Sequence, residues 1–544
     1  MARDSRDARS VTAAFVPQPG TRVALLVGYA VITFLSFPHP LAGSVIDLGL
    51  WLSWAAPAAL LLGLQGLAPG RAARVAFFAG LLAFSGVLHW FYVVTVSYGH
   101  APPWIGVLAV VGAALYPAVA VALFGGGIAL FDRGRAPSPF FAAALWVSLD
   151  WLRSFFLTGF PWGTLGYAQH ENAALLGLAP FAGVYGLSFA TVLAGAALAR
   201  GVLDFRRGGR IGTQAGVAMA VVLALHLVGW FARAPRLEGE TIRVAALQGN
   251  IEQGLKWSRE NKDRTFSIYE ALSMEAAADG AELIVWPETA LPQALRDGQV
   301  PAALSGLIRE TAAATVVGAV GIERRPGGGT AYFDSAFVFG AEGEAVARYD
   351  KSHLVPFGEY VPLRDWLGGV LEGVATGIAP SDVSEGAGPF AIALPLGEGG
   401  SGRAVRVGVP ICYELLFPDL VRRFVGDGAQ ILLALTNDAW YGRTGAPYQF
   451  LAMTALRSAE TGVYTVRAAN SGVSAIIDER GAVLESLPIF ERGWLAADVP
   501  LRAPGRGETF YVRHGDVFVG LCLGGLAIAI AGRRLRRRAA EGTA

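Results

Sequence analysis

Three short blocks in the second half of the chain bring together residue types that can perform acyl transfer. They are 286–289 (WPET), 349–359 (YDKSHLVPFGE) and 411–414 (ICYE), and they contain Glu288, Lys351 and Cys412. A thiol attacks carbonyl carbons well, but with an ordinary pKa near 8.5 it needs a base or a cationic neighbour. Glu288 could accept the thiol proton. Lys351 and the backbone N–H after Cys412 could stabilise the oxyanion of a tetrahedral intermediate.

Each of these residues also has a simpler interpretation. A lone cysteine at the end of a strand is more often a buried structural residue, and glutamate and lysine side chains are usually solvated. The combination of the three blocks favours chemistry. The other cysteine, Cys522, lies in an apolar run, so a disulfide with Cys412 is improbable and no disulfide framework is indicated.

Alternating strand and helix patterns predict an α/β domain that positions these residues. Ligands bind at the carboxyl ends of strands in open α/β sheets, and all three blocks follow strand patterns. Sixty-three residues separate Glu288 from Lys351 and sixty-one separate Lys351 from Cys412, so each must come from a different strand. The predicted strands are 242–247, 283–286, 315–319, 335–339, 405–410, 431–435, 465–468 and 474–477, and the predicted helices are 260–278, 302–314, 418–425 and 449–461.

The rest of the chain has the composition of a membrane protein. Hydrophobic residues make up 53% and charged residues 16%, against about 25% charged in soluble domains. The mean hydropathy is +0.45. Only 14 charged residues lie between Val23 and Trp230, from totals of 44 basic and 43 acidic. These values exclude a disordered chain, a secreted disulfide scaffold and an ordinary cytosolic enzyme. A net charge of +1 does not favour nucleic-acid binding, and no His/Cys cluster has metal-ligand spacing.

Apolar runs long enough to cross about 30 Å of hydrocarbon predict eight spans. They are 23–37, 45–64, 75–98, 104–131, 140–157, 173–199, 213–232 and 516–531. We therefore expect a membrane domain at 1–235 with seven transmembrane helices, an extramembrane domain at 236–513, and an eighth helix with a basic tail at 514–544. Arginines cluster before the first span and after the second, fourth, sixth and eighth, which predicts that both termini are cytoplasmic and the polar domain lies outside.

Two further segments allow more than one interpretation. Asp150 and Arg153, followed by the turn-rich block 158–163 (TGFPWG), fit either a structural ion pair with an interfacial aromatic belt or the edge of a lipid-facing substrate cleft. The apolar, glycine-containing stretch 366–371 fits either a lid that dips into the bilayer or a helix that packs in the core. The lid hypothesis involves Trp366, Leu367, Val370 and Leu371.

Several blocks, taken in order, resemble a known family. WPE at Glu288, the lysine block and CYE at Cys412 are similar to the nitrilase superfamily, which uses a Glu-Lys-Cys triad. The variant HLVPFGEYVP, together with LTGFPWG, TNDAWYG and the predicted spans, more closely resembles the apolipoprotein N-acyltransferase family. The resemblance covers nearly the whole chain. It implies an αββα sandwich domain attached to a polytopic α-helical membrane domain.

The resemblance also implies an activity. Members transfer a fatty acyl chain from a phospholipid, typically phosphatidylethanolamine, to the amino group of a lipoprotein's diacylglyceryl-cysteine. They do so at the bacterial inner membrane, with the catalytic domain on the periplasmic side. The expected route is ping-pong through a thioester, without cofactor or metal. The expected partners are these two lipid substrates and the bilayer, and not nucleic acid.

The family's functional residues correspond to positions in this sequence. Cys412 corresponds to the nucleophile, Glu288 to the general base and Lys351 to the oxyanion stabiliser. The other matched positions shape the site or bind substrate: Trp257, an aromatic near the substrate entrance, Glu359, Tyr413, Glu414, Asn437 and Arg467. The roles of Asn437 and Arg467 are the least defined of these.

Three other functions fit the sequence less well. A membrane-tethered amidase or nitrilase could use the same triad, but it would leave the eight predicted spans without a purpose. A scaffold without catalytic activity is disfavoured by the intact Glu288, Lys351 and Cys412. A transporter would suit the number of spans, but the apolar runs lack the chain of intramembrane charges that ion coupling usually needs.

Overall fold

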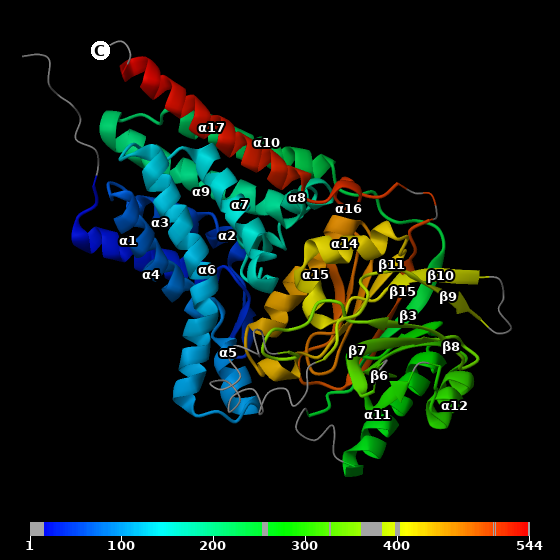
Figure 1. The fold of residues 1–544 in the computed structure, drawn as a ribbon. Coiled ribbons are helices and arrows are strands. Elements are labelled where there is room, and N and C mark those ends of the chain that lie inside the picture. Colours follow the sequence, from blue (N-terminus) through cyan, green and yellow to red (C-terminus); the bar gives the residue numbers. More distant parts are fainter. Residues whose placement is uncertain are drawn as a thin grey trace, which may run out of the picture.

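A computed structural model describes residues 16–252, 259–296, 298–325, 328–360, 383–397, 403–503, 505 and 507–541. The predicted entrance residue Trp257 and the predicted lid at 366–371 lie outside these ranges. The described chain forms a group of long helices beside a pair of β-sheets (Figure 1). The C-terminal helix α17 returns from the sheets to the helical group.

The helical group contains the first ten helices and the last one. These are α1 Pro19–Leu35, α2 Gly49–Leu52, α3 Ala55–Leu64, α4 Pro69–Val87, α5 Trp90–Val93, α6 Pro103–Asp132, α7 Pro139–Arg153, α8 Ala173–Leu176, α9 Ala179–Gly208, α10 Thr213–Phe231 and α17 Val517–Glu541. The first turns of α1, α4, α6, α7 and α9 contain proline, which lacks the N–H that a helix leaves unsatisfied there.

Five of these helices, α4, α6, α9, α10 and α17, are long and apolar enough to cross a membrane. Each overlaps one of the eight predicted spans. The other three predicted spans are shorter helices: α1 has 17 residues, α3 has 10 and α7 has 15. A helix of 10 residues is about 15 Å long, half the hydrocarbon thickness. The predicted count of eight spans is therefore not confirmed.

The predicted span at 45–64 is broken for an identifiable reason. Its first residues belong to a hairpin of strands β1 His39–Leu41 and β2 Ser44–Ile46, and α2 follows. The longest helix left within this apolar run is α3. Most of the α3 side chains are buried inside the protein. Hydropathy alone does not distinguish an apolar residue that faces lipid from one that faces protein.

The strands form two larger sheets. A seven-stranded sheet has the order β15-β3-β4-β6-β7-β8, with β5 also paired to β6, and a six-stranded sheet has the order β14-β13-β12-β11-β10-β9. The bounds are β3 Thr241–Gln248, β4 Leu283–Val285, β5 Leu291–Arg296, β6 Ala314–Arg324, β7 Thr330–Phe339, β8 Ala345–Asp350, β9 Ile392–Leu396, β10 Arg403–Gly408, β11 Ile431–Thr436, β12 Thr465–Ala469, β13 Ala475–Ile477, β14 Val483–Ser486 and β15 Gly493–Pro500. Strands β3, β4 and β6 are parallel, as are β10, β11 and β12.

Every predicted strand overlaps an observed one. In the two larger sheets β5, β8, β9, β14 and β15 are additional, as are β1 and β2 of the hairpin. The additional strands have weak patterns. For example, all four residues of β14 are exposed, and β9 contains Pro395. The four predicted helices correspond to α11 Arg259–Ala278, α12 Ala302–Thr311, α14 Pro418–Gly426 and α15 Ala446–Thr461; the short α16 Phe510–His514 precedes α17.

Alternation along the strands produces the layers of this domain. Val244 and Ala246 of β3 belong to the core shared with the six-stranded sheet, whereas Ala245 and Leu247 pack with residues of α11 and α12. On the other side, α14 and α15 cover the six-stranded sheet (Figure 1). The result is the four-layer αββα arrangement that the family resemblance implies.

Helix α15 also contacts the helical group, so it lies between that group and the six-stranded sheet (Figure 1). Gln449 of α15 accepts a hydrogen bond from Trp162 Nε1 at 2.7 Å, and Glu460 accepts one from the backbone N–H of Val184 at 2.8 Å. Val184 follows Gly183, where α9 is kinked at a positive φ of 58°. The sheet that leads to Cys412 is therefore attached to the helices on its outer side.

Candidate active site

Glu288 lies just after β4, in a tight crossing against β6. Gly318 of β6 passes so close that a Cβ added there would lie 2.1 Å from the carbonyl oxygen of Pro287. Thr289 has a positive φ of 46°, which a non-glycine residue rarely adopts. A glycine on β6 thus allows the chain to turn sharply after the strand, and Glu288 is buried at that turn.

Lys351 directly follows β8 and is fully buried. Its Nζ donates to three carboxylates: Glu359 Oε1 at 2.5 Å, Asp334 Oδ2 at 3.3 Å and Glu288 Oε1 at 3.4 Å. Burial by itself lowers the pKa of Lys351, but the three carboxylates outweigh it and hold that pKa well above its ordinary value. The lysine is therefore a permanent cation beside Glu288.

The three carboxylates could also form a metal site, because one oxygen from each lies within 4.8 Å of the others. The ammonium group of Lys351 already supplies the positive charge between them. Burial and the nearby Glu288 raise the pKa of Asp334 well above its ordinary value, despite Lys351. Burial also raises the pKa of Glu359. The single cation of Lys351 therefore faces three carboxyl groups.

Cys412 follows β10 and opens a 3-10 turn that spans Cys412–Leu416. Its φ of 46° is left-handed, a strained conformation that persists only where the surroundings enforce it. Burial raises the pKa of the Cys412 thiol well above its ordinary value, and the charge of Glu288 adds to this while Lys351 opposes it. The resting thiol is therefore protonated, and a base is needed to activate it.

Glu414 joins the turn Cys412–Leu416, the cysteine turn, to the loop that begins at Lys351, the lysine loop. Its Oε1 accepts hydrogen bonds from Tyr349 Oη at 2.6 Å, Ser352 N at 2.8 Å and Ser352 Oγ at 2.8 Å. Its Oε2 accepts a bond from the N–H of Ile411 at 2.8 Å. Two loops from different sheets are thus tied together by one buried carboxylate, which fixes Lys351 relative to Cys412.

The remaining predicted residues lie around this centre. Glu359 binds Lys351 with Oε1, and its Oε2 accepts a hydrogen bond of 2.8 Å from the backbone N–H of Val355. Tyr413 Oη donates to the carbonyl of Gly159, in the helical half, at 3.0 Å.

Asn437 and Arg467 belong to a neighbouring polar group behind the cysteine turn. Arg467 Nη2 donates to Asp438 Oδ2 at 2.8 Å, and both side chains are fully buried. Asn437 Oδ1 accepts a hydrogen bond from Asn470 Nδ2 at 3.2 Å. The charge of Asp438 acts on the Cys412 thiol. Arg467 therefore neutralises a carboxylate next to the site and does not itself pair with the lysine cluster's acids.

Sequence reasoning missed Asp334, Tyr349 and Ser352, all of which contact predicted site residues. Asp334 has a detectable signal, since it is the one acidic residue in the apolar strand 330–339 (TAYFDSAFVF). An acid in such a strand requires a buried partner. Tyr349 and Ser352 flank Lys351 in the sequence, but nothing local indicates that they bind Glu414.

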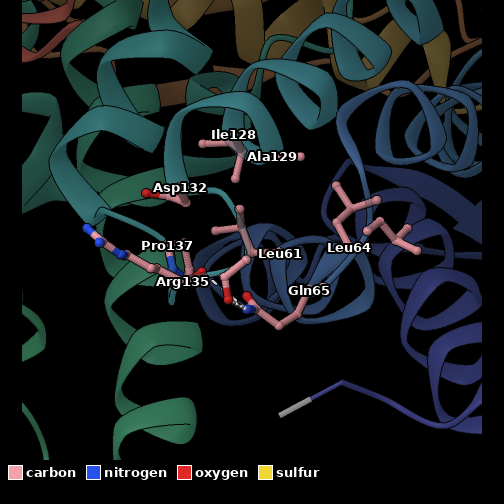
Figure 2. A pocket seen from close by; sticks show the side chains of 11 residues that line it. Leu61, Leu64, Gln65, Ile128, Ala129, Asp132, Arg135 and Pro137 are labelled. Carbon is pink, nitrogen blue, oxygen red and sulfur yellow. Dashed lines mark hydrogen bonds between the residues drawn. The ribbon is translucent and has the colours of Figure 1, made fainter. Parts of the chain in front are cut away.

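A separate pocket lies in the helical half, between the ends of α3 and α6 and the loop that follows α6 (Figure 2). Leu61, Leu64 and Ile128 form apolar walls, and Asp132 and Arg135 are among the polar residues. Gln65 donates to the carbonyl oxygens of Gly134 at 3.0 Å and Arg135 at 3.1 Å, which holds the loop at the pocket. No triad residue lines it, so this pocket is not the acyl-transfer site.

Comparison with known proteins places both halves of the chain. The model of the carbon-nitrogen hydrolase family matches residues 243–504, and the model of the apolipoprotein N-acyltransferase N-terminal domain matches residues 29–197. A solved amidase from Nesterenkonia sp. is 19% identical with a TM-score of 0.36, and the match covers 52% of this chain and 97% of the amidase.

Curated relatives match over most of their length. The apolipoprotein N-acyltransferase of Geobacter metallireducens is 40% identical, and the match covers 95% of each chain. That of Nitrosomonas europaea is 37% identical over 86% of this chain and 90% of its own. The Azotobacter vinelandii protein of the same name is 34% identical over 96% of each. Identity of this extent across both halves shows that the chain belongs to the apolipoprotein N-acyltransferase family.

Proposed function

We propose that this membrane acyltransferase moves a fatty acyl chain from a phospholipid to the N-terminal diacylglyceryl-cysteine of a lipoprotein, through a thioester on Cys412. The observation that carries the mechanism is the buried Glu288–Lys351 contact at 3.4 Å, whose charges both act on the Cys412 thiol. A base and a fixed cation beside one thiol are the groups that acyl transfer requires.

The first half-reaction acylates the enzyme. Glu288 accepts the proton of the Cys412 thiol, and the thiolate attacks the ester carbonyl carbon of the phospholipid. A C–S bond forms, and Lys351 with the N–H of Tyr413 stabilises the oxyanion. Collapse of the intermediate breaks the ester C–O bond. Glu288 returns its proton to the leaving glycerol oxygen, and a lysophospholipid departs.

The second half-reaction releases the product. The neutral α-amino group of the lipoprotein attacks the thioester carbon, and Glu288 takes a proton from the attacking nitrogen. A C–N bond forms, the C–S bond breaks, and Glu288 reprotonates the thiolate. The amine must react before water does, so burial of Cys412 favours transfer over hydrolysis.

The residues around the triad then have supporting roles. Glu359 and Asp334 fix the Lys351 ammonium group, and Glu414 keeps the two catalytic loops in register. Asn437 and Arg467 shape the back of the site through Asn470 and Asp438. These assignments follow from the hydrogen bonds and ion pairs given above.

We further propose how the protein sits in the membrane. The shorter helices α1 and α7, and α3 together with the preceding α2, complete with the five long ones a domain of eight spans in the bacterial inner membrane. The arginines at both ends favour cytoplasmic termini, which leaves the two-sheet domain on the periplasmic side. Phosphatidylethanolamine is the proposed donor. Labelling single cysteines introduced at Arg533 and Arg309 with an impermeant reagent in intact spheroplasts tests the orientation, since only the second should react.

A membrane-tethered carbon-nitrogen hydrolase is the alternative, because the family match at residues 243–504 describes that chemistry. Intact-protein mass spectrometry separates the two functions. After incubation with phosphatidylethanolamine, the wild type should carry one fatty acyl adduct that is absent from Cys412→Ala. A diacylglyceryl-cysteine peptide should discharge it and gain the acyl chain. If no adduct forms, or only water removes it, the transferase assignment is wrong.

A further inference from the structure

The segment 156–164, which we call the bracket, follows the C-terminal end of α7 and contacts the catalytic domain. Three successive residues in it, Leu157, Thr158 and Gly159, have positive φ values of 49°, 74° and 88°. A Cβ on Gly159 would lie 2.2 Å from the carbonyl oxygen of Ser154 and 3.0 Å from the ring of Phe417. Such a backbone persists only when its surroundings determine it.

Arg153, the last residue of α7, holds the bracket from inside the protein. Its Nη1 donates to the carbonyl oxygens of Trp162 at 3.0 Å and Phe160 at 3.2 Å, and its Nη2 donates to Thr164 Oγ1 at 3.1 Å. The side chain is 5% exposed, and Asp150 neutralises it at 2.9 Å. The planar fork of an arginine suits several acceptors at once, which a lysine ammonium group cannot reproduce.

Asp150 is itself held in place from a second helix. Its other carboxylate oxygen accepts a hydrogen bond from Ser188 Oγ, on α9, at 3.3 Å. The bracket is therefore fixed to two helices of the membrane half, at the end nearest the catalytic domain.

The bracket reaches both catalytic loops. The carbonyl oxygen of Gly159 accepts a hydrogen bond of 3.0 Å from the hydroxyl of Tyr413. Tyr413 directly follows the nucleophile in the sequence. The backbone of Thr158 lies close enough to His353, two residues after Lys351, to act on the pKa of its ring. The His353 ring packs on Phe417 with centroids 3.9 Å apart. One strained segment thus touches the loops that carry the nucleophile and the oxyanion-stabilising cation.

We propose that Arg153 is a positioning residue for acyl transfer. By holding the bracket carbonyls, it places the Gly159 oxygen under the Tyr413 hydroxyl and so orients the peptide N–H that follows Cys412. The ion pair with Asp150 offsets the cost of burying the guanidinium charge. The hydrogen bonds of the guanidinium group hold the bracket in position. This inference rests on the proposed Cys412 thioester route.

The test compares full-length wild type with Arg153→Lys in nanodiscs that contain phosphatidylethanolamine. The lysine keeps a charge for Asp150 but not the fork. The maximal rate of Cys412 acylation, followed by intact-protein mass spectrometry, should fall about 10- to 100-fold, as expected for a small misplacement of reacting groups. The half-saturating phospholipid concentration and the thermal midpoint should stay close to wild type. A purely structural role would instead lower the midpoint and leave the rate of the folded fraction unchanged.

Arg200→Lys is the matched control. Arg200 also pairs with an aspartate, Asp204 at 3.1 Å, and also donates to two backbone carbonyls, of Ala136 and Pro137. It lies near the opposite end of the helical group and contacts neither catalytic loop. Its acylation rate should equal that of the wild type. A decrease as large as that of Arg153→Lys would overturn the proposal.

Tyr413→Phe keeps the inference testable if Arg153→Lys does not fold. It removes only the hydroxyl that binds Gly159, and it should slow acylation with little loss of stability. In a folded double variant the two effects should not multiply, because both act through the same contact. A wild-type rate in Tyr413→Phe, or multiplicative effects, contradicts the inference. Absence of an adduct in the wild type contradicts the proposed function instead.

Discussion

Helices α11 and α15 occupy the two outer layers of the same sandwich, yet their surroundings differ sharply. In α11, the buried residues Thr265, Tyr269, Leu272, Ser273 and Ala276 form one stripe, and the opposite face is exposed. In α15, 14 of the 16 residues are buried, because α15 is covered by the sheet on one side and by membrane-half helices on the other. The sandwich is thus solvated on one face only.

The charges on the two sides follow the same division. On the side of α15, Arg457 and Glu460 form a completely buried pair at 2.9 Å, supported by Tyr167 and the N–H of Val184. On the side of α11, Arg243 pairs with Asp279 while both remain partly exposed. Cys412 lies after a strand of the sheet beneath α15. The side of the sandwich that carries Cys412 therefore depends on the helical group for its packing. The side covered by α11 is packed and solvated like a soluble enzyme.

The largest expected effect concerns the two triad residues that come from different sheets. Lys351→Met and Cys412→Ala should each reduce acyl transfer at least about 1000-fold, because each removes an essential group. Only Lys351→Met should also destabilise the protein, by about 3–5 kcal/mol, since it leaves three buried carboxylates without their cation. Activity assays combined with thermal unfolding measure both. Equal thermal midpoints for the two variants would show that the lysine cluster is not a structural element.

The next effect concerns the buried pair on α15. Arg457→Met should cost roughly 3 kcal/mol of stability, because Glu460 would remain buried without its cation. The double variant Arg457→Met/Glu460→Gln should recover much of this loss. Thermal unfolding in one detergent provides the measurement. If the single and double variants unfold at the same temperature, the loss does not come from an unpaired Glu460. The buried pair would then not distinguish the α15 side from the α11 side.

A smaller effect depends on pH. Burial lowers the pKa of His353 to about 4. The unfolded chain, with a histidine pKa near 6.5, therefore binds a proton more readily than the folded protein between pH 6.5 and 4. Stability should decline as pH falls through that window, by on the order of 1–2 kcal/mol at pH 5. His353→Phe should flatten that part of the pH–stability curve, and an unchanged curve would exclude His353 as its origin.

The smallest effect is expected on the solvated side. Arg243→Met removes an exposed ion pair and should change stability by less than about 1 kcal/mol, since water and salt screen such pairs. The remaining effect should shrink further in about 1 M salt. This variant is the counterpart of Arg457→Met. A loss of similar size in both would remove the proposed difference between the two faces.

Much of the catalytic domain was predictable because its information is local. The apolar patterns that precede Glu288 and Cys412 are continuous, so each residue was predicted at the carboxyl end of a strand. These strands, β4 and β10, belong to different sheets, so the packing of the two sheets brings the ends together. Asp334 was not predicted as a lysine partner, because its contact with Lys351 depends on the pairing of β7 with β8. Trp257 and the 366–371 segment stay predictions.

The membrane half was predictable in composition but not in detail. Within the described residues, hydropathy identified the regions of the five long apolar helices and of the shorter apolar helices α1 and α3. The predicted span at 140–157 corresponds to α7. It could not show that residues 39–46 form a hairpin, or that α3 is only 10 residues long. A run of apolar residues has the same composition whether lipid or protein surrounds it, so its length in helix is settled by packing.

The sequence by itself determined which chemistry is available, which segments are apolar and which family the chain resembles, because residue type and periodicity are properties of neighbours along the chain. The tertiary structure alone decided that three carboxylates share the Lys351 ammonium group, that Glu414 joins two loops, and that Arg153 in the membrane half reaches the cysteine turn through Gly159. These contacts join residues from different parts of the chain. Burial gives them their strength, and burial exists only once the layers have packed.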